Sequence, residues 1–285
     1  MRSRTMPTTS VLHGRDLLLR YGRTTVVHGV STVLEPGRVT ALVGPNGSGK
    51  STLLRALARL HPVHDGEITV GHPPRPVAQL SSRDFAREVT LFTQSRQAPP
   101  GLTVREVVAF GRHPHRRRFA GPGPDDQAAV DRAMRLTGVQ DKAGRPGGEL
   151  SGGEMQRVWL AASLAQETGV VLLDEPTNHL DLRYQIETLD LVRDLADEHG
   201  VAVGIVLHDL DHAARVADTL LLLSAGRVHA AGDPLEVLTA ENLSAVYGLR
   251  VEVGTDPLTG RLRIDPVGRH PVRYRTTVSG EKKSA

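Results

Sequence analysis

Cysteine is absent from this sequence, and lysine is scarce: four lysines stand against thirty-one arginines. Without cysteine the chain has neither a disulfide framework nor a thiolate metal site, which fits a reducing compartment. No apolar run approaches the roughly 18 residues of a membrane span, and residues 1–10 lack the apolar core of a secretory signal. Any membrane association must therefore come through a partner. The net charge of +3 is too small to indicate a nucleic-acid partner, and we expect none.

A glycine-rich segment contains one of the few lysines and fits the phosphate-binding pattern G-x-x-x-x-G-K-[ST] at every fixed position. Its residues are Gly44, Pro45, Asn46, Gly47, Ser48, Gly49, Lys50, Ser51 and Thr52. A buried-strand pattern at 39–43 precedes it, and a helix pattern at 52–58 follows it. The glycines let backbone N–H groups turn towards an anion, at the positive end of the new helix. Lys50 supplies a point charge for the β- and γ-phosphates and Ser51 a hydroxyl for Mg²⁺, so the sequence predicts nucleoside triphosphate binding.

A second apolar strand pattern, at 170–173, ends in the two carboxylates Asp174 and Glu175. Ligands of a parallel α/β sheet bind at the carboxyl ends of its strands. We therefore expect Asp174 to hold Mg²⁺ through water, and Glu175 to polarise an attacking water as a general base. An ordinary strand followed by a solvated acidic turn is the alternative, but the phosphate loop favours the catalytic interpretation.

The segment 150–154, Leu-Ser-Gly-Gly-Glu, predicts the start of a helix, because Ser151 and Glu154 have the spacing of a capping box. Two glycines in a first helical turn each cost roughly 1 kcal/mol relative to alanine, and a simple cap does not need them. Bare N–H groups at a helix N-terminus suit an anion. The segment is thus a second candidate anion site.

Strand and helix patterns alternate along the chain, which predicts the α/β class with a largely parallel core sheet. The expected segments are an N-terminal β layer at 11–21 and 24–34, short strands at 67–70 and 89–93, helices at 104–111 and 125–137 around a basic loop at 112–123, strands at 170–173, 201–207 and 219–224, and a β-hairpin at 251–265. The middle helices indicate a helical insertion in the α/β domain.

The motifs occur together in the order found in the ATPase subunits of ATP-binding cassette (ABC) transporters, which the chain resembles over residues 11–267. The resemblance depends on the phosphate loop at 44–52, the LSGGE signature at 150–154, LLDEPTNHLD at 172–181 and His208. It implies the P-loop NTPase fold of an ABC ATPase, with a parallel core sheet, an N-terminal antiparallel β layer and an inserted helical subdomain. It also implies an enzyme that hydrolyses ATP with Mg²⁺ and acts as a head-to-tail homodimer with two ATP molecules at the interface.

The resemblance assigns roles to further residues. Gln94 matches a glutamine that contacts Mg²⁺ and water, His208 a histidine that contacts the γ-phosphate, and Tyr21 an aromatic residue that stacks on adenine. The expected catalytic residues are Glu175, His208, Gln94 and Lys50, and the expected metal ligands are Ser51, Gln94 and Asp174.

The signature residues Ser151, Gly152 and Gly153 would contact the γ-phosphate of ATP held by the second protomer. Residues 178–181 match the family's D-loop, and Asp181 is expected at the same nucleotide interface. Two departures from the common pattern are mild. The signature ends in Glu154 where glutamine is commoner, and the D-loop has the sequence NHLD where SALD is commoner. Neither removes a reacting group.

The same pattern predicts the domain organisation. Residues 1–10 are expected to form a flexible N-terminus, and residues 11–267 the ABC ATPase domain. The helical subdomain is expected at about 95–168, and residues 268–285 are expected to form a basic flexible tail.

A narrower likeness concerns the cargo. Residues 110–115 resemble the GRxPH stretch of ATPases that energise the uptake of iron–siderophore, haem and cobalamin. We expect a ferric-siderophore importer, with haem or cobalamin as alternative cargoes. The implied partners are transmembrane permease subunits and an extracytoplasmic substrate-binding protein, with the chain as a peripheral subunit at the cytoplasmic face of the membrane.

Two other functions are less favoured. A soluble ABC ATPase acting on ribosomes or DNA usually has two cassettes or long coiled coils, whereas this chain has one cassette and no heptad stretch. A non-hydrolysing regulatory subunit is opposed by the intact Glu175 and His208.

The segment 112–119 carries four arginines and two histidines. We expect it to face the permease or nearby anionic lipid, where each basic side chain contributes on the order of 1 kcal/mol. The alternative is a solvated loop that only keeps the protein soluble.

Overall fold

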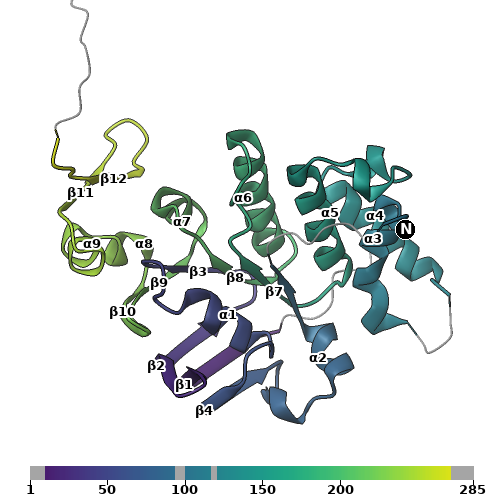
Figure 1. Cartoon of the computed structure of the whole chain (residues 1–285), viewed down its shortest axis with the longest axis horizontal. Helices are drawn as coiled ribbons and strands as arrows, with labels where there is room; N and C mark the ends of the chain where they lie inside the picture. The colour runs from purple at the N-terminus through teal and green to yellow at the C-terminus, as the bar shows by residue number, and fades with distance from the viewer. Residues whose placement is uncertain (1–9, 94–99, 117–120, 271–285) are drawn as a thin grey trace, which may run out of the picture.

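Two β-sheets form the frame of the molecule, as a computed structural model shows for residues 10–93, 100–116 and 121–270 (Figure 1). The core sheet has the strand order β10-β9-β3-β8-β7-β6, and the second sheet has the order β2-β1-β4-β5. The core strands are β3 (Val39–Val43), β6 (Val89–Phe92), β7 (Val170–Asp174), β8 (Ala202–Val206), β9 (Thr219–Ser224) and β10 (Arg227–Gly232). The second sheet contains β1 (Leu12–Tyr21), β2 (Thr24–Leu34), β4 (Val63–Val70) and β5 (Arg75–Pro76).

The core sheet is parallel from β9 to β6, and only its edge strand β10 runs antiparallel to its neighbour. Every residue of β3, β7 and β8 is buried, as expected for parallel strands that are covered on both faces. The second sheet is antiparallel throughout. The expected α/β class, with a parallel core sheet and an antiparallel N-terminal layer, is confirmed.

Helix α1 (Lys50–Leu57) lies between the two sheets. Its leucines Leu53, Leu54 and Leu57 are fully buried in one cluster with residues of β1, β2 and β4 and with Leu42 and Leu172 of the core sheet. The opposite face of the core sheet is covered by α6 (Leu182–Asp197) and α7 (Leu210–Val216). Because both faces are packed, the carboxyl ends of the parallel strands form the open edge where the candidate site residues lie.

The segment between β6 and β7 is largely helical, and Figure 1 shows its helices grouped at one end of the molecule. Its elements are α3 (Val104–Val108), η2 (Ala109–His115), α4 (Pro124–Leu136), η3 (Gln140–Lys142), η4 (Gly147–Glu149) and α5 (Gly152–Ala165). The helix η1 (Val77–Gln79) and α2 (Ser82–Glu88) precede β6.

The prediction of a helix at 104–111 followed by a loop from 112 is wrong in detail. The α-helix ends at Val108, and a 3₁₀ segment that contains Pro114 continues to His115. The expectation that the basic segment faces a partner is wrong for Arg112, whose side chain is buried. Residues 117–119 of that segment lie outside the described residues.

The chain after β9 returns along the sheet edge and adds elements that the sequence pattern did not predict. These are β10, α8 (Pro234–Val237) and α9 (Ala240–Tyr247). The predicted hairpin is confirmed as β11 (Val251–Thr255) and β12 (Leu262–Pro266). No described helix combines the length and apolar character that a bilayer crossing requires. The division into domains stays a prediction, and residues 1–9 and 271–285 lie outside the described ranges.

Candidate nucleotide site

The glycine-rich segment links the end of β3 to the start of α1. Lys50 is the first residue of α1 and is buried, and its Nζ donates to the carbonyl oxygens of Gly44 at 2.8 Å and Pro45 at 2.9 Å. Gly44 has a φ of 138°, and a Cβ there would lie 2.1 Å from the Leu223 carbonyl oxygen. The loop therefore curls around the ammonium group, and its first position requires glycine.

Three features of this loop suit a phosphate group. The N-cap residue Gly49 gives α1 no side-chain cap, so the first N–H groups of the helix remain available to an anion. The Ser48 hydroxyl is buried and has no hydrogen-bond partner within the described part of the chain. Burial lowers the pKa of Lys50, while the negative charges of Glu175 and Asp174 act in the opposite direction. An anion would supply the partner that these groups need.

Asp174 ends β7 and is buried beside α1. Its Oδ1 accepts a hydrogen bond from Ser51 Oγ at 2.7 Å, and its Oδ2 accepts one from Arg55 at 3.2 Å. The described residues hold no group of three or more His, Asp or Glu side chains that could bind a metal alone. Ser51 and Asp174 fit Mg²⁺, because this ion is usually held by one or two protein ligands together with substrate phosphates.

Glu175 and His208 follow the neighbouring strands β7 and β8, and the sheet brings them together. His208 Nε2 lies 2.5 Å from Glu175 Oε1, and Asn178 Nδ2 donates to Glu175 Oε2 at 2.5 Å. Glu175 has a φ of 56°, which is uncommon outside glycine and is typical of strained functional positions. The carboxylate is thus oriented through both oxygens at the edge where Lys50 begins α1.

The signature segment starts α5, and the predicted capping box is present. Ser151 Oγ accepts from the Glu154 N–H at 3.3 Å, and Glu154 Oε2 accepts from the Ser151 N–H at 2.8 Å. A Cβ on Gly152 would meet open space, whereas one on Gly153 would lie 3.5 Å from Leu180. Figure 1 shows α5 grouped with α3 and α4, away from α1. Within one chain, the signature helix and the phosphate loop therefore belong to separate parts of the molecule.

The remaining predicted site residues have different surroundings. Tyr21 ends β1 with 52% of its surface exposed, and its ring centroid lies 4.6 Å from that of His61. Asp181 is the N-cap of α6 and accepts from the Tyr184 N–H at 3.1 Å. Gln94 lies outside the described residues, two positions after β6.

Comparison with known proteins identifies the family. The sequence model described as "ABC transporter" matches residues 27–178, which is more than half of the chain. The chain belongs to the ABC transporter family. Among ATP-binding proteins of this family, it is 41% identical over 258 residues to the ferric enterobactin transport ATP-binding protein FepC of Escherichia coli, covering 90% of this chain and 94% of the relative.

Further ABC relatives cover less of one chain or the other. The chain is 40% identical over 220 residues to the iron(3+)-hydroxamate import ATP-binding protein FhuC of Bacillus subtilis, covering 77% of this chain and 81% of the relative. It is 49% identical over 227 residues to the cobalamin import ATP-binding protein BtuD of Halobacterium salinarum, covering 79% of this chain but only 56% of the relative.

A solved structure shares the ABC ATPase fold along nearly its whole length. It belongs to a metal-chelate type ABC transporter in an inward-facing conformation, with a TM-score of 0.78 and 27% sequence identity. The match covers 91% of this chain and 98% of the other. The expected family and fold are therefore confirmed.

Sequence reasoning missed two side chains that contact residues of the candidate nucleotide site. Arg55 contacts Asp174, and its only sequence signal is a position four residues after Ser51, on the same face of α1. Tyr247 of α9 forms a hydrogen bond with the Gly44 backbone; burial raises the pKa of Tyr247, and this bond opposes the rise. Nothing local in the sequence connects Tyr247 with a loop two hundred residues earlier.

Proposed function

We propose that the chain is the ATP-hydrolysing subunit of an importer for ferric siderophores. The similarity to the ferric enterobactin protein, which extends over 90% of this chain, carries the proposal. Relatives named for a siderophore, iron(3+)-hydroxamate, achromobactin and petrobactin support the same cargo class. Cobalamin is the second candidate, because the cobalamin import proteins of Halobacterium salinarum have the higher identity of 49% over a shorter alignment.

The proposed chemistry is hydrolysis of ATP at the edge of the core sheet. Lys50 and the N-terminus of α1 bind the phosphates, and Ser51 and Asp174 would hold Mg²⁺, which would neutralise phosphate charge. Glu175 accepts a proton from the attacking water. His208, 2.5 Å from Glu175, holds that carboxylate and faces the same edge.

Other roles in the proposal depend on the family resemblance. Tyr21 stacks on adenine from its exposed position at the end of β1. Gln94 would contact Mg²⁺ and water. Asp181 lies at the interface with a second protomer.

The proposed working unit contains two copies of the chain, arranged head to tail. Figure 1 shows α5 and α1 in different parts of one chain, which supports this arrangement, since the signature of each copy would complete the site of the other. Ser151, Gly152 and Gly153 would then contact the γ-phosphate bound by the partner. Permease subunits and an extracytoplasmic substrate-binding protein complete the importer, with this chain at the cytoplasmic face of the membrane.

The cargo is tested by transport. The chain is purified with the permease that accompanies it and placed in proteoliposomes with the external binding protein. ATP-dependent uptake of iron-labelled ferric enterobactin or ferric hydroxamate is expected, and the Lys50→Ala chain should give none. Uptake of cobalamin without uptake of either iron complex would replace the siderophore assignment with the second candidate.

A further inference from the structure

The GRxPH stretch at 110–115 lies outside the nucleotide site, yet its arginine is buried. Among the arginines and lysines of the described ranges, Arg112 and Lys50 are the ones with buried side chains. Gly111, beside Arg112, approaches α5 so closely that a Cβ would lie 1.9 Å from the Ala162 carbonyl oxygen. The backbone of η2 therefore lies in close contact with α5, the helix that begins at the signature.

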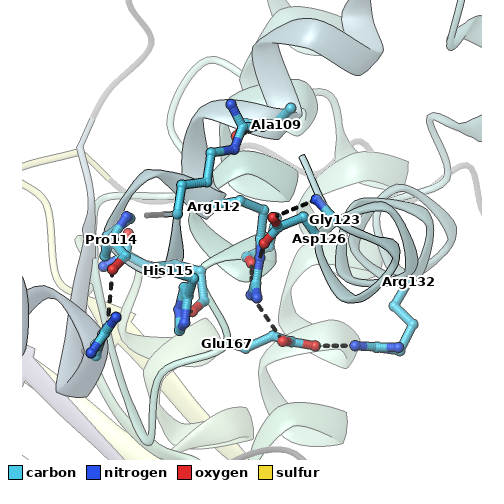
Figure 2. A network of polar contacts seen from close by, with 12 residues as sticks. Ala109, Arg112, Pro114, His115, Gly123, Asp126, Arg132 and Glu167 are labelled. Atoms are coloured by element: carbon cyan, nitrogen blue, oxygen red, sulfur yellow. Dashed lines mark hydrogen bonds and ion pairs between the residues drawn. The ribbon is translucent and has the colours of Figure 1, made fainter. Parts of the chain in front are cut away.

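Arg112 connects α4 to the C-terminal end of α5, as Figure 2 shows. Its Nε donates to Asp126 Oδ1 at 2.9 Å, and its Nη1 donates to Glu167 Oε2 at 2.9 Å and to the Ala165 carbonyl oxygen at 2.8 Å. Glu167 also pairs with Arg132 of α4. The last carbonyls of a helix have no intrahelical partner and carry its negative dipole end, so a guanidinium group is well placed there. Arg112 thus caps α5 and links it to α4.

Hydrogen bonds join the same end of α5 to the core sheet, and others join η2 to α2. Thr90 of β6 donates to Gln166 Oε1 at 3.1 Å, and His115 Nε2 lies 2.7 Å from the Gln166 carbonyl oxygen. Two arginines of α2 donate to the Pro114 carbonyl oxygen, at 2.9 and 3.0 Å. The segment that contains Arg112 is therefore held between the helical part and the core.

A small rotation at this end would be amplified at the signature. Helix α5 has 14 residues and is about 21 Å long at about 1.5 Å per residue. A tilt of about 5° at the Arg112 end moves the N-terminus by about 2 Å over that length, and a misplacement of about 1 Å can cost on the order of 100-fold in rate. Near the signature, Gln156 Nε2 donates to the Pro176 carbonyl oxygen at 2.7 Å, so α5 is held at both ends. The contacts of Arg112 supply the C-terminal hold, and their loss would leave the direction of α5 fixed at one end only.

We propose that Arg112 is a positioning residue for the signature: it sets the direction of α5, and so places Ser151 to Gly153 against the nucleotide of the second protomer. The proposal rests on the head-to-tail arrangement proposed above. It predicts that loss of Arg112 damages the partner's site and leaves the phosphate loop of its own chain intact.

The first measurement separates hydrolysis from nucleotide binding. Arg112→Gln should lower ATPase activity at least about tenfold, while the affinity of the single chain for a fluorescent ATP analogue stays within about twofold. Arg105→Gln is the matched control, because Arg105 also pairs across to α4, with Asp131, but both side chains are partly exposed. The control should retain wild-type hydrolysis.

Mixtures of variant chains locate the damage. The Lys50→Ala chain has an intact signature and a disabled phosphate loop, and the Ser151→Arg chain has the reverse. Arg112→Gln chains should recover ATPase when mixed with Lys50→Ala chains but not with Ser151→Arg chains. At equal ratios the recovery is up to about a quarter of wild type, since half of the dimers are mixed and each has one intact site.

A control mixture tests the arrangement itself. Lys50→Ala mixed with Ser151→Arg should recover activity without any change at Arg112, and its failure would reject the head-to-tail proposal. If this control recovers, recovery of Arg112→Gln with both partners would overturn the positioning role.

Arg112→Lys keeps a buried charge without the guanidinium fork, and it is mixed in the same way in case Arg112→Gln does not fold. Recovery of neither Arg112 variant with Lys50→Ala would show general structural damage and would also overturn the proposal.

Discussion

Glu175→Gln isolates the proposed proton acceptor, because glutamine keeps the shape of the side chain and loses its basicity. The amide can still accept from Asn178 and donate to His208, so both contacts of the side chain have a replacement. Glutamine and glutamate face the same restriction at a φ of 56°, so the backbone is not further strained. The substitution should therefore leave the fold and ATP binding intact.

The expected loss of rate follows from the value of general-base catalysis. Such a group contributes about 10²–10⁴-fold, which corresponds to a barrier increase of about 3–5 kcal/mol. Steady-state phosphate release measures the rate, and a fluorescent ATP analogue measures binding. ATP should also trap the variant as a closed dimer, visible as a mass shift on size-exclusion chromatography.

A matched control separates the role of this carboxylate from a general effect of removing charge. Glu252 lies on β11 and pairs with Arg250 at 2.8 Å, and both side chains are exposed. Such pairs contribute about 0–1 kcal/mol, so Glu252→Gln should hydrolyse ATP like wild type. Hydrolysis by Glu175→Gln within a few-fold of wild type would refute the general-base role.

Three further substitutions probe the rest of the molecule. Lys50→Ala should abolish tight ATP binding, since the buried ammonium group is lost; unchanged affinity in a binding titration would reject the phosphate-loop assignment. Arg55→Gln should raise the Mg²⁺ concentration needed for nucleotide binding, because Asp174 loses the donor on Oδ2; an unchanged Mg²⁺ titration would show that Arg55 does not orient that carboxylate. Burial, together with the charge of Asp209, raises the pKa of Asp211, so the native state binds the extra proton and stability falls as pH rises through the folded pKa. Asp211→Asn should thus raise the melting temperature at neutral pH and have little effect below the ordinary value of 3.8; equal shifts at both pH values would contradict this explanation.

The phosphate loop, the capping box of α5 and the strand that ends at Asp174 could all be predicted from the sequence. Each is a local pattern: its glycines, caps and apolar runs determine backbone conformation over a few residues. The capping box, for example, joins Ser151 and Glu154, which are one helical turn apart. Local rules were sufficient there because the partners are neighbours in the chain.

The elements between β9 and the β11–β12 hairpin could not be predicted in the same way. Helices α8 and α9 have four and eight residues, and helices this short are unstable alone, so they depend on packing such as that of the fully buried Leu243. The sequence also suggested that Arg112 faces outwards, since arginine is mostly exposed. Its burial depends on the carboxylates of Asp126, on α4, and of Glu167, which follows the end of α5.

Residue type and spacing alone thus determined which groups carry the chemistry, and strand order and helix packing decided which of them meet. Ser51 and Asp174 are 123 positions apart, and Glu175 and His208 are 33 apart. They come together because β7 lies beside β8, while α1 packs over the same sheet. Arg112 meets Ala165 across 53 positions because η2 is packed against α5. Contacts at such separations are formed by the burial of apolar faces between whole elements, and no local backbone preference encodes them.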